Sequence, residues 1–96
     1  MRPATQKPDS NTPEIRDMLK DLRERGWLLE FIEPPNGFGC DFVIFLYGRS
    51  LYVEVKTPEK RNRFTPQEVK LMEICKKTRN EYYVIISPEE LLEVIG

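Results

Sequence analysis

The sequence predicts one α/β domain in which helices flank a mixed four-stranded sheet, with the elements in the order αβββαβα. Three observations lead to this fold class: a helix-spaced apolar stripe near the N-terminus, three consecutive segments of β-forming residues, and a capping box before a second helical pattern. At 96 residues the chain is long enough for one hydrophobic core and too short for two. Every motif is therefore expected to belong to a single domain.

The first helix is expected to follow a polar tail. Residues 1–11 include two prolines and no periodic apolar pattern, which predicts a flexible N-terminal tail and a domain at residues 12–96. Thr12 and Pro13 suit an N-cap and the first helical position. The apolar stripe of this helix consists of Ile15, Met18, Leu19 and Leu22. Gly26 is expected to end the helix.

Three strands are expected next. Residues 27–33 are rich in β-forming side chains, including Trp27, which we expect in the core, and this strand stops at two prolines. Residues 42–47 are apolar on both faces, as in the middle of a covered sheet. Residues 51–56 alternate between apolar and polar side chains. Residues 48–49 (GR) between them predict a tight hairpin turn.

The C-terminal third is predicted to contain a helix, a strand and a second, shorter helix. A basic loop at 57–63 leads to a capping box at 65–68 (TPQE), which opens a helix that runs to about Lys77. Residues 82–86 form the fourth predicted strand. An N-cap at Ser87 then begins the last helix. Its apolar residues are Leu91, Leu92, Val94 and Ile95.

The composition narrows the possible chemistry. The chain is 40% apolar and 32% charged, with a net charge of −1 and no histidine, which excludes His-dependent catalytic triads and most zinc enzymes. Cys40 and Cys75 form no CxxC pair, so neither a disulfide scaffold nor a zinc cluster is predicted. No apolar run is long enough to span a bilayer, and the N-terminus does not resemble a signal peptide. We therefore expect a cytoplasmic protein that is not secreted.

Pairing across the predicted turn brings three charged residues onto one face of the sheet. It sets Val43 opposite Glu54 and Asp41 opposite Lys56, so that Asp41 and Glu54 are diagonal neighbours roughly 7 to 8 Å apart at Cβ. Two carboxylates without a His or thiolate partner favour a hard cation, Mg²⁺, with Mn²⁺ as a substitute. Such an ion can polarise a phosphodiester and activate water. Lys56 could orient that water or offset developing negative charge.

The same residues also have a structural interpretation. Glu-x-Lys pairs are common on solvated strand faces, where the ion pair has little energetic consequence. Against this, an aspartate at the entrance of a strand buried on both faces is costly without a partner. From Lys56 to Arg79 there are eight Lys or Arg residues and three Glu residues, a charge balance suited to a polyanion. Within that segment the candidate DNA-binding residues are Lys60, Arg61 and Arg63.

Three motifs resemble those of a known nuclease family. They are residues 39–44 (GCDFVI), 52–57 (YVEVKT) and 64–67 (FTPQ). In combination and spacing they are similar to the VRR-NUC (virus-type replication-repair nuclease) group of the PD-(D/E)XK superfamily, over residues 13–95. The resemblance implies a restriction-endonuclease-like αβββαβ core, a divalent metal ion, phosphodiester hydrolysis and a preference for branched or otherwise structured DNA. The stand-alone viral and bacterial members resemble junction-cutting homodimers, so a homodimer is expected here as well.

The resemblance also assigns roles position by position. It gives Asp41 and Glu54 the role of metal ligands and Lys56 that of the catalytic lysine. The backbone carbonyl of Val55 is a further candidate metal ligand. Cys40 stands where the family usually has a proline before the aspartate, which puts the geometry of the strand entrance in question and leaves the ligands intact.

Two further matches have structural explanations beside the functional ones. The resemblance matches Glu14 to the acidic residue of the first helix, but the helix macrodipole favours any carboxylate in a first turn. It matches Gln67 to the glutamine that opens the second helix; Gln67 precedes Leu71 and Ile74 on one helical face, which aims it toward the sheet. Glu68 is explained by the capping box and receives no catalytic role.

The leading hypothesis is therefore a Mg²⁺-dependent DNA endonuclease with Asp41, Glu54, Lys56 and Gln67 as catalytic residues. One alternative is a non-catalytic nucleic-acid-binding module on the same fold, in which Lys56 and the basic loop only contact phosphates. A second alternative is a small interaction protein whose charged strand residues form an exposed ion pair. Cleavage assays on branched and linear DNA would separate the three.

Overall fold

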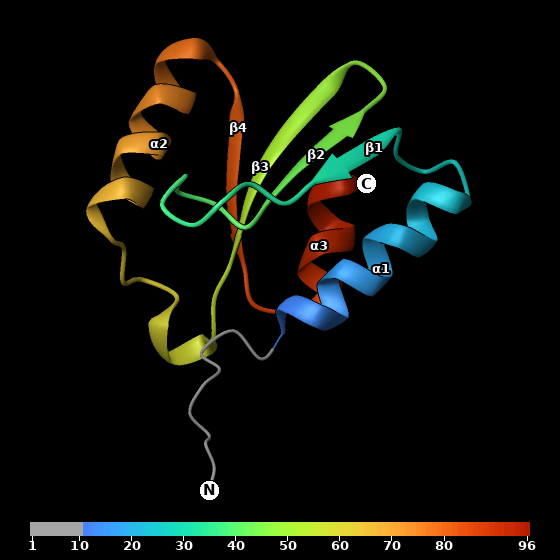
Figure 1. The fold of residues 1–96 in the computed structure, drawn as a ribbon, viewed down its shortest axis with the longest axis horizontal. Coiled ribbons are helices and arrows are strands. Elements are labelled where there is room, and N and C mark those ends of the chain that lie inside the picture. Colours follow the sequence, from blue (N-terminus) through green and yellow to red (C-terminus); the bar gives the residue numbers. More distant parts are fainter. Residues whose placement is uncertain (1–10) are drawn as a thin grey trace, which may run out of the picture.

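The computed structural model describes residues 11–96 and has the predicted order of elements (Figure 1). The elements are α1 (Thr12–Glu24), β1 (Glu30–Ile32), β2 (Phe42–Leu46), β3 (Arg49–Val55), the 3₁₀ helix η2 (Pro58–Lys60), α2 (Pro66–Thr78), β4 (Glu81–Ile85) and α3 (Pro88–Ile95). The predicted tail, residues 1–11, lies outside the described residues except for Asn11. None of the helices within residues 11–96 is both long enough and apolar enough to cross a membrane.

The four strands form one mixed sheet in the order β1-β2-β3-β4. β1 with β2, and β2 with β3, pair in antiparallel fashion, whereas β3 and β4 are parallel and are connected through α2. Helices α1 and α3 cover one face of the sheet and α2 covers the other (Figure 1). The prediction of an α/β fold with a mixed four-stranded sheet flanked by helices is confirmed.

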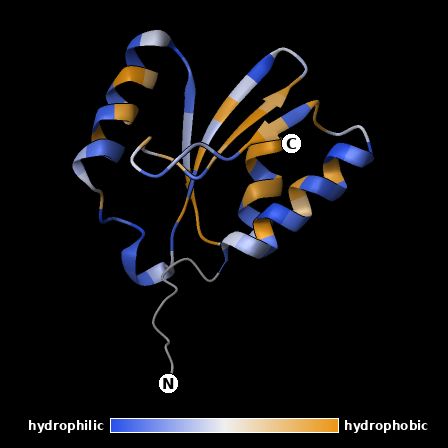
Figure 2. Ribbon diagram, in the orientation of Figure 1, coloured by the Kyte–Doolittle hydropathy of each residue, from blue (hydrophilic) through white to orange (hydrophobic). Residues whose placement is uncertain are grey.

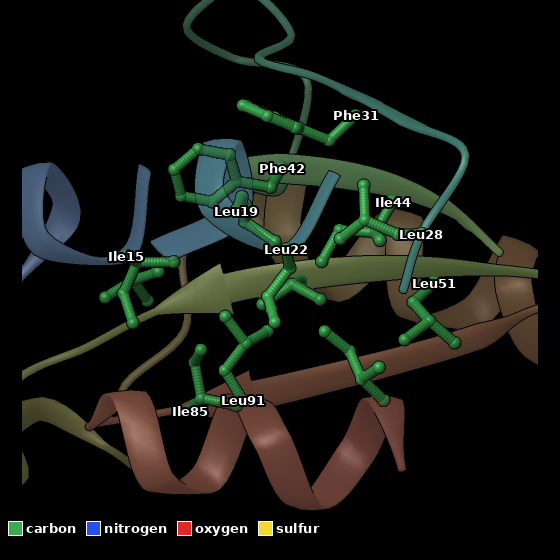
Figure 3. Packing of buried hydrophobic residues seen from close by; sticks show 13 residues of the cluster. Ile15, Leu19, Leu22, Leu28, Phe31, Phe42, Ile44, Leu51, Ile85 and Leu91 are labelled. Carbon is green, nitrogen blue, oxygen red and sulfur yellow. The ribbon is translucent and has the colours of Figure 1, made fainter. Parts of the chain in front are cut away.

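Most of the apolar core lies between the sheet and the α1–α3 layer (Figure 3). The predicted stripe of α1 supplies Ile15, Leu19 and Leu22, all buried, and it is visible as an apolar band on an otherwise polar helix (Figure 2). The sheet and α3 supply Phe31, Phe42, Ile44, Leu51, Val53, Val55, Ile85, Leu91 and Ile95. Removing these side chains from water is the main stabilising contribution to the fold.

The face covered by α2 has a much smaller apolar cluster. Its buried members are Cys40, Val43, Leu71 and Cys75. Both cysteines are free thiols, and burial, with the nearby charges of Glu54 and Asp41, raises the pKa of Cys40 to about 12. A reactive thiolate at Cys40 is therefore not expected.

The β2–β3 hairpin differs from the prediction by two residues in register. Val43 pairs with Tyr52, two residues before its predicted partner, and the turn consists of Tyr47 and Gly48. Gly48 has a φ of 90°, a conformation that other residues rarely adopt, so glycine takes the second turn position and Arg49 already belongs to β3. Because the shift is an even number of residues, every side chain keeps its predicted face.

The first strand is shorter than the predicted segment at 27–33. Trp27, expected in the core, is 61% exposed, whereas the neighbouring Leu28 is buried. The cause lies in the end of α1, where Gly26 has a φ of 82° and the Trp27 amide donates to the Leu22 carbonyl at 2.9 Å. This turn directs the side chain of Trp27 outward before β1 begins.

Candidate active site

Asp41 lies at the bend before β2 and is bonded to the end of β3. Its backbone N–H donates to the Val53 carbonyl at 2.9 Å, and its Oδ2 accepts the Val55 N–H at 2.8 Å. These bonds continue the β2–β3 register, so Asp41 lies directly opposite Glu54. The prediction had placed the two residues diagonally across from each other. Val53 and Val55 face the α1–α3 core, so the Glu54 side chain between them faces α2.

Glu54, Lys56 and Glu68 form a buried charged cluster beneath the start of α2. Lys56 Nζ is 2.8 Å from Glu68 Oε1 and 3.8 Å from Glu54 Oε2. The three side chains are only 10% to 11% exposed. Lys56 Nζ also lies 5.5 Å from the ring centroid of Phe64. Asp41 on the neighbouring strand lies opposite Glu54, so three carboxyl groups gather here, and the one ammonium group, that of Lys56, pairs with two of them.

Glu68 is the member of this cluster that the sequence reasoning missed. It completes the predicted capping box, because Thr65 Oγ1 accepts the Glu68 N–H at 3.2 Å and Glu68 Oε1 accepts the Thr65 N–H at 3.0 Å. The same Oε1 accepts the hydrogen bond of Lys56 Nζ. Helical spacing could have identified it, since Glu68, Leu71 and Cys75 are the buried residues of α2 and recur at three- and four-residue intervals.

The surroundings shift the pKa values of the two buried glutamates in opposite directions. Burial raises the pKa of Glu54 to about 9; the charges of Asp41 and Glu68, and a hydrogen bond with Glu68, act in the same direction, and Lys56 opposes them. Burial also acts to raise the pKa of Glu68, but hydrogen bonds from Lys56 and Thr65 outweigh it and hold the pKa below its usual value. Glu68 is therefore the charged partner of Lys56, and a further cation beside Glu54 would favour its ionised form.

The segment 34–40 crosses the sheet and forms one wall of the site (Figure 1). Gly39 has a φ of 111°, and a Cβ there would lie 2.8 Å from the Gln67 carbonyl oxygen, so only glycine permits this approach to α2. Tyr82 Oη donates to the Gly39 carbonyl at 2.7 Å, and Gln67 Nε2 donates to the Gly37 carbonyl at 2.6 Å. The prediction that Gln67 is aimed toward the sheet is wrong, because its side chain is exposed. Its hydrogen bond links the 34–40 segment to α2.

Two neighbouring clefts open on the charged cluster. The first, of about 410 Å³, lies between the 34–40 segment and the start of α2, and Asp41 and Gln67 line it. The second, of about 500 Å³, lies between the end of β3 and the loop that follows it. The second cleft is lined by Lys56, Thr57, Lys60, Arg63 and Phe64 together with the residues common to both clefts. Those common residues are Glu54, Thr65 and Glu68.

The other predicted site residues separate into two groups. Lys60 and Arg63 line the second cleft, whereas the Arg61 guanidinium hydrogen-bonds to Glu90 at the start of α3. Glu14 is exposed on α1 and lines neither cleft. The fold thus brings the predicted residues of β2, β3 and α2 together, and leaves Glu14 and Arg61 outside the two clefts.

The groups that could hold a metal ion are oxygen donors. Asp41 and Glu54 both line the first cleft, and the backbone of Val55 is bonded to the Asp41 carboxylate. No group of three His, Cys, Asp or Glu side chains suited to a metal ion occurs within residues 11–96. Mg²⁺ needs only one or two carboxylates, because it keeps several waters and takes phosphate oxygens. A bound cation would offset both the burial and the neighbouring carboxylates that raise the pKa of Glu54, so this donor set fits a hard divalent ion.

Comparisons of the chain with protein-family models, with curated proteins and with solved structures found no match. The function has to be argued from the site itself. The resemblance of the three sequence motifs to the VRR-NUC group remains a hypothesis beside that argument.

Proposed function

We propose that this protein is a metal-dependent DNA endonuclease of the PD-(D/E)XK type, similar to the VRR-NUC group. The observation that supports the proposal most is that Glu54 lies where two clefts meet, with Asp41 lining the first cleft beside it and Lys56 lining the second. An exposed ion pair does not describe these residues, since Glu54 and Lys56 are only 10% and 11% exposed. Buried charges of this kind cost stability, and a buried ionisable group that borders a cleft is a candidate for a functional site.

The residues divide the reaction between them. Asp41 and Glu54 would hold the divalent cation, with the Val55 carbonyl as a further ligand. When bound, Mg²⁺ or Mn²⁺ supplies Lewis-acid polarisation of the phosphodiester and a lowered pKa for a nearby water. Lys56 donates a hydrogen bond to the attacking water or to the phosphate oxygen that gains charge. Gln67 acts as a positioning residue through the 34–40 segment that it anchors.

The charge distribution around the clefts suits a nucleic acid. Lys60 and Arg63 line the cleft beside Lys56, on the side away from Asp41. A phosphodiester in the first cleft would leave neighbouring phosphates within reach of these two cations. Branched or otherwise structured DNA is the substrate class that the motif resemblance implies.

A homodimer forms part of the proposal, because one domain offers one site and cutting both strands requires two oriented copies. Light scattering of the full chain at assay concentration should give twice the monomer mass. A monomer that cuts both strands of a duplex in one encounter would contradict this part of the proposal.

The test is a cleavage assay with purified protein on labelled branched and linear DNA, with Mg²⁺ and with a chelator. We expect cleavage only with the metal, and its loss in Asp41→Asn and Lys56→Ala. Glu59→Gln is the matched control. Glu59 is an exposed acidic residue of η2, in the segment that follows Lys56, and it lines neither cleft.

Each result decides between the hypotheses. Binding of DNA without cleavage by the wild-type protein would support the non-catalytic nucleic-acid-binding module. Undiminished cleavage in Asp41→Asn would remove that residue from the metal site. Neither binding nor cleavage would leave the protein as an interaction module.

A further inference from the structure

Phe64 is an aromatic residue without a place in the apolar core. Its side chain is 39% exposed, and it belongs to neither of the two buried clusters. The ring lies against Lys56, whose Nζ is 5.5 Å from the ring centroid. The ring borders the second cleft, and a large part of it stays open to solvent.

Phe64 shares the second cleft with three cationic side chains, those of Lys56, Lys60 and Arg63, and with two acidic ones, those of Glu54 and Glu68, which also line the first cleft. Lys60 and Arg63 come from the same loop as Phe64, and the hydroxyl-bearing residues Thr57 and Thr65 complete this side. The cleft volume of about 500 Å³ lies within the range of roughly 300 to 1,000 Å³ that small-molecule pockets occupy. An exposed aromatic face among cations is the arrangement by which proteins hold single-stranded nucleic acid, because bases stack on the ring and phosphates meet the cations.

Other exposed aromatic residues do not share this setting. Tyr47, at the tip of the β2–β3 hairpin, is 68% exposed, Trp27 is 61% exposed and Phe38 is 42% exposed. None of the three lines either cleft of the candidate site. Exposure alone therefore does not single out Phe64; its position between Lys56 and the two loop cations does.

We infer that the second cleft binds an unpaired DNA base, stacked on Phe64, beside the phosphodiester that occupies the first cleft. A base inside a duplex has both faces covered by its neighbours, so only an unstacked base can meet the ring. Phenylalanine has no hydrogen-bonding group, so stacking on the ring does not itself select one base over another. The inference rests on the proposed function for the first cleft, and it makes an unpaired nucleotide beside the cleavage position the feature that the protein recognises.

The test measures binding in a chelator, so that no cleavage is required. Fluorescence anisotropy compares a duplex that contains a short unpaired gap with the same duplex fully paired. Phe64→Leu, which keeps apolar volume but loses the π-face, should bind the gapped DNA about 5- to 100-fold more weakly and the paired DNA unchanged. Phe64→Trp, which keeps an aromatic ring, should bind gapped DNA more tightly than paired DNA, as the wild type does. Tyr47→Leu, which removes an exposed aromatic outside the site, should match the wild type.

Photocross-linking gives a second result that does not depend on any variant. DNA with 5-iodouracil at the unpaired position is irradiated in complex with the wild-type protein, and peptide mass spectrometry locates the adduct. An adduct on Phe64 supports the inference. An adduct elsewhere, or equal binding of gapped DNA by wild type and Phe64→Leu, overturns it.

The outcomes separate this inference from the proposed nuclease activity. Phe64-dependent binding without cleavage in Mg²⁺ would leave the base-binding cleft standing and reject the nuclease. Metal-dependent cleavage with no contribution from Phe64 would do the reverse.

Discussion

The two faces of the sheet are built differently. The face covered by α1 and α3 has a cluster of thirteen buried apolar residues, and the face covered by α2 has four. Among the described residues the buried acidic side chains are Glu54 and Glu68, and both lie on the α2 side, paired with Lys56. The face covered by α1 and α3 therefore contributes most of the stability. The face covered by α2 can accommodate a destabilising polar cluster without loss of the fold.

A matched pair of core truncations tests this division, and we expect the largest effect here. Leu91 on α3 is fully buried in the larger cluster, and Leu91→Ala should lower the free energy of unfolding by about 3 to 5 kcal/mol. Leu71 on α2 is 8% exposed in the smaller cluster, and Leu71→Ala should cost about 2 kcal/mol. Urea unfolding monitored by circular dichroism measures both. Equal losses would mean that the two faces stabilise the fold equally.

The link between Glu68 and Lys56 is the next test, on the α2 face alone. Glu68→Gln keeps a side chain that can complete the capping box but removes the charge that holds Lys56 Nζ at 2.8 Å. We expect kcat to fall by roughly tenfold or more with KM close to wild type, and the free energy of unfolding to fall by about 1.5 to 3 kcal/mol, the contribution of a hydrogen bond to a charged group.

Glu68→Ala separates the two roles of this residue. It should show the same fall in kcat and, in addition, a loss of about 1 kcal/mol of stability from the broken cap. Full kcat in Glu68→Gln would show that Lys56 needs no charged partner, and Glu68 would then have only its helix-capping role.

Substitutions in the basic loop, residues 57–63, should have a smaller effect, on the salt dependence of DNA binding, and the loop contains its own control residue. Lys60 and Arg63 line the second cleft, whereas Arg61 is bonded to Glu90. Lys60→Ala/Arg63→Ala should reduce the slope of log K against log salt by roughly 1.8 for duplex DNA, about 0.9 for each lost phosphate contact. Arg61→Ala removes the same type of charge and should leave the slope unchanged. A larger change for Arg61→Ala than for the double variant would mean that the DNA passes over α3.

The smallest expected effect belongs to an ion pair at the far end of β3. Hydrogen bonds from Arg49, and then from Tyr83, hold the pKa of Glu81 at about 2. Because this folded-state pKa lies below the usual value of 4.5, the pair stabilises the protein above about pH 4.5 and loses that contribution as the pH falls toward 2. The partners are 38% and 33% exposed, so the contribution should stay below about 1 kcal/mol.

Urea unfolding of the wild type and of Glu81→Gln across this pH range measures that contribution. The wild type should be slightly more stable at neutral pH, and the difference should vanish near pH 2. A difference that grows on acidification would contradict the assignment of the depressed pKa to this pair.

Much of the fold and part of the site follow from local sequence patterns. The stripe of α1 and the capping box at Thr65 were predicted because each depends on residues within a few positions of one another. The shared face of Asp41, Glu54 and Lys56 depends only on the two-residue period of strands. It therefore survived an error of two residues in the hairpin register.

The remaining features depend on contacts between segments that are distant in sequence. The hairpin register follows from the positive φ of Gly48, which local composition did not distinguish from a turn one residue later. The burial of Glu68 follows from how α2 lies on the sheet. The different directions of Arg61 and Arg63 follow from the position of Glu90, and no periodicity in a loop encodes that.

The most direct test of the account is the behaviour of Glu54→Gln, measured for stability and for cleavage in the same preparation. The variant removes one of the two carboxyl groups beside Lys56 while the closer Lys56–Glu68 pair remains. We predict cleavage at least about a thousandfold below wild type, since metal-assisted charge stabilisation contributes several kcal/mol, together with an unfolding free energy in chelator equal to or above that of the wild type. Retained cleavage, or a marked loss of stability, would contradict the claim that Glu54 is required for cleavage and does not stabilise the folded protein.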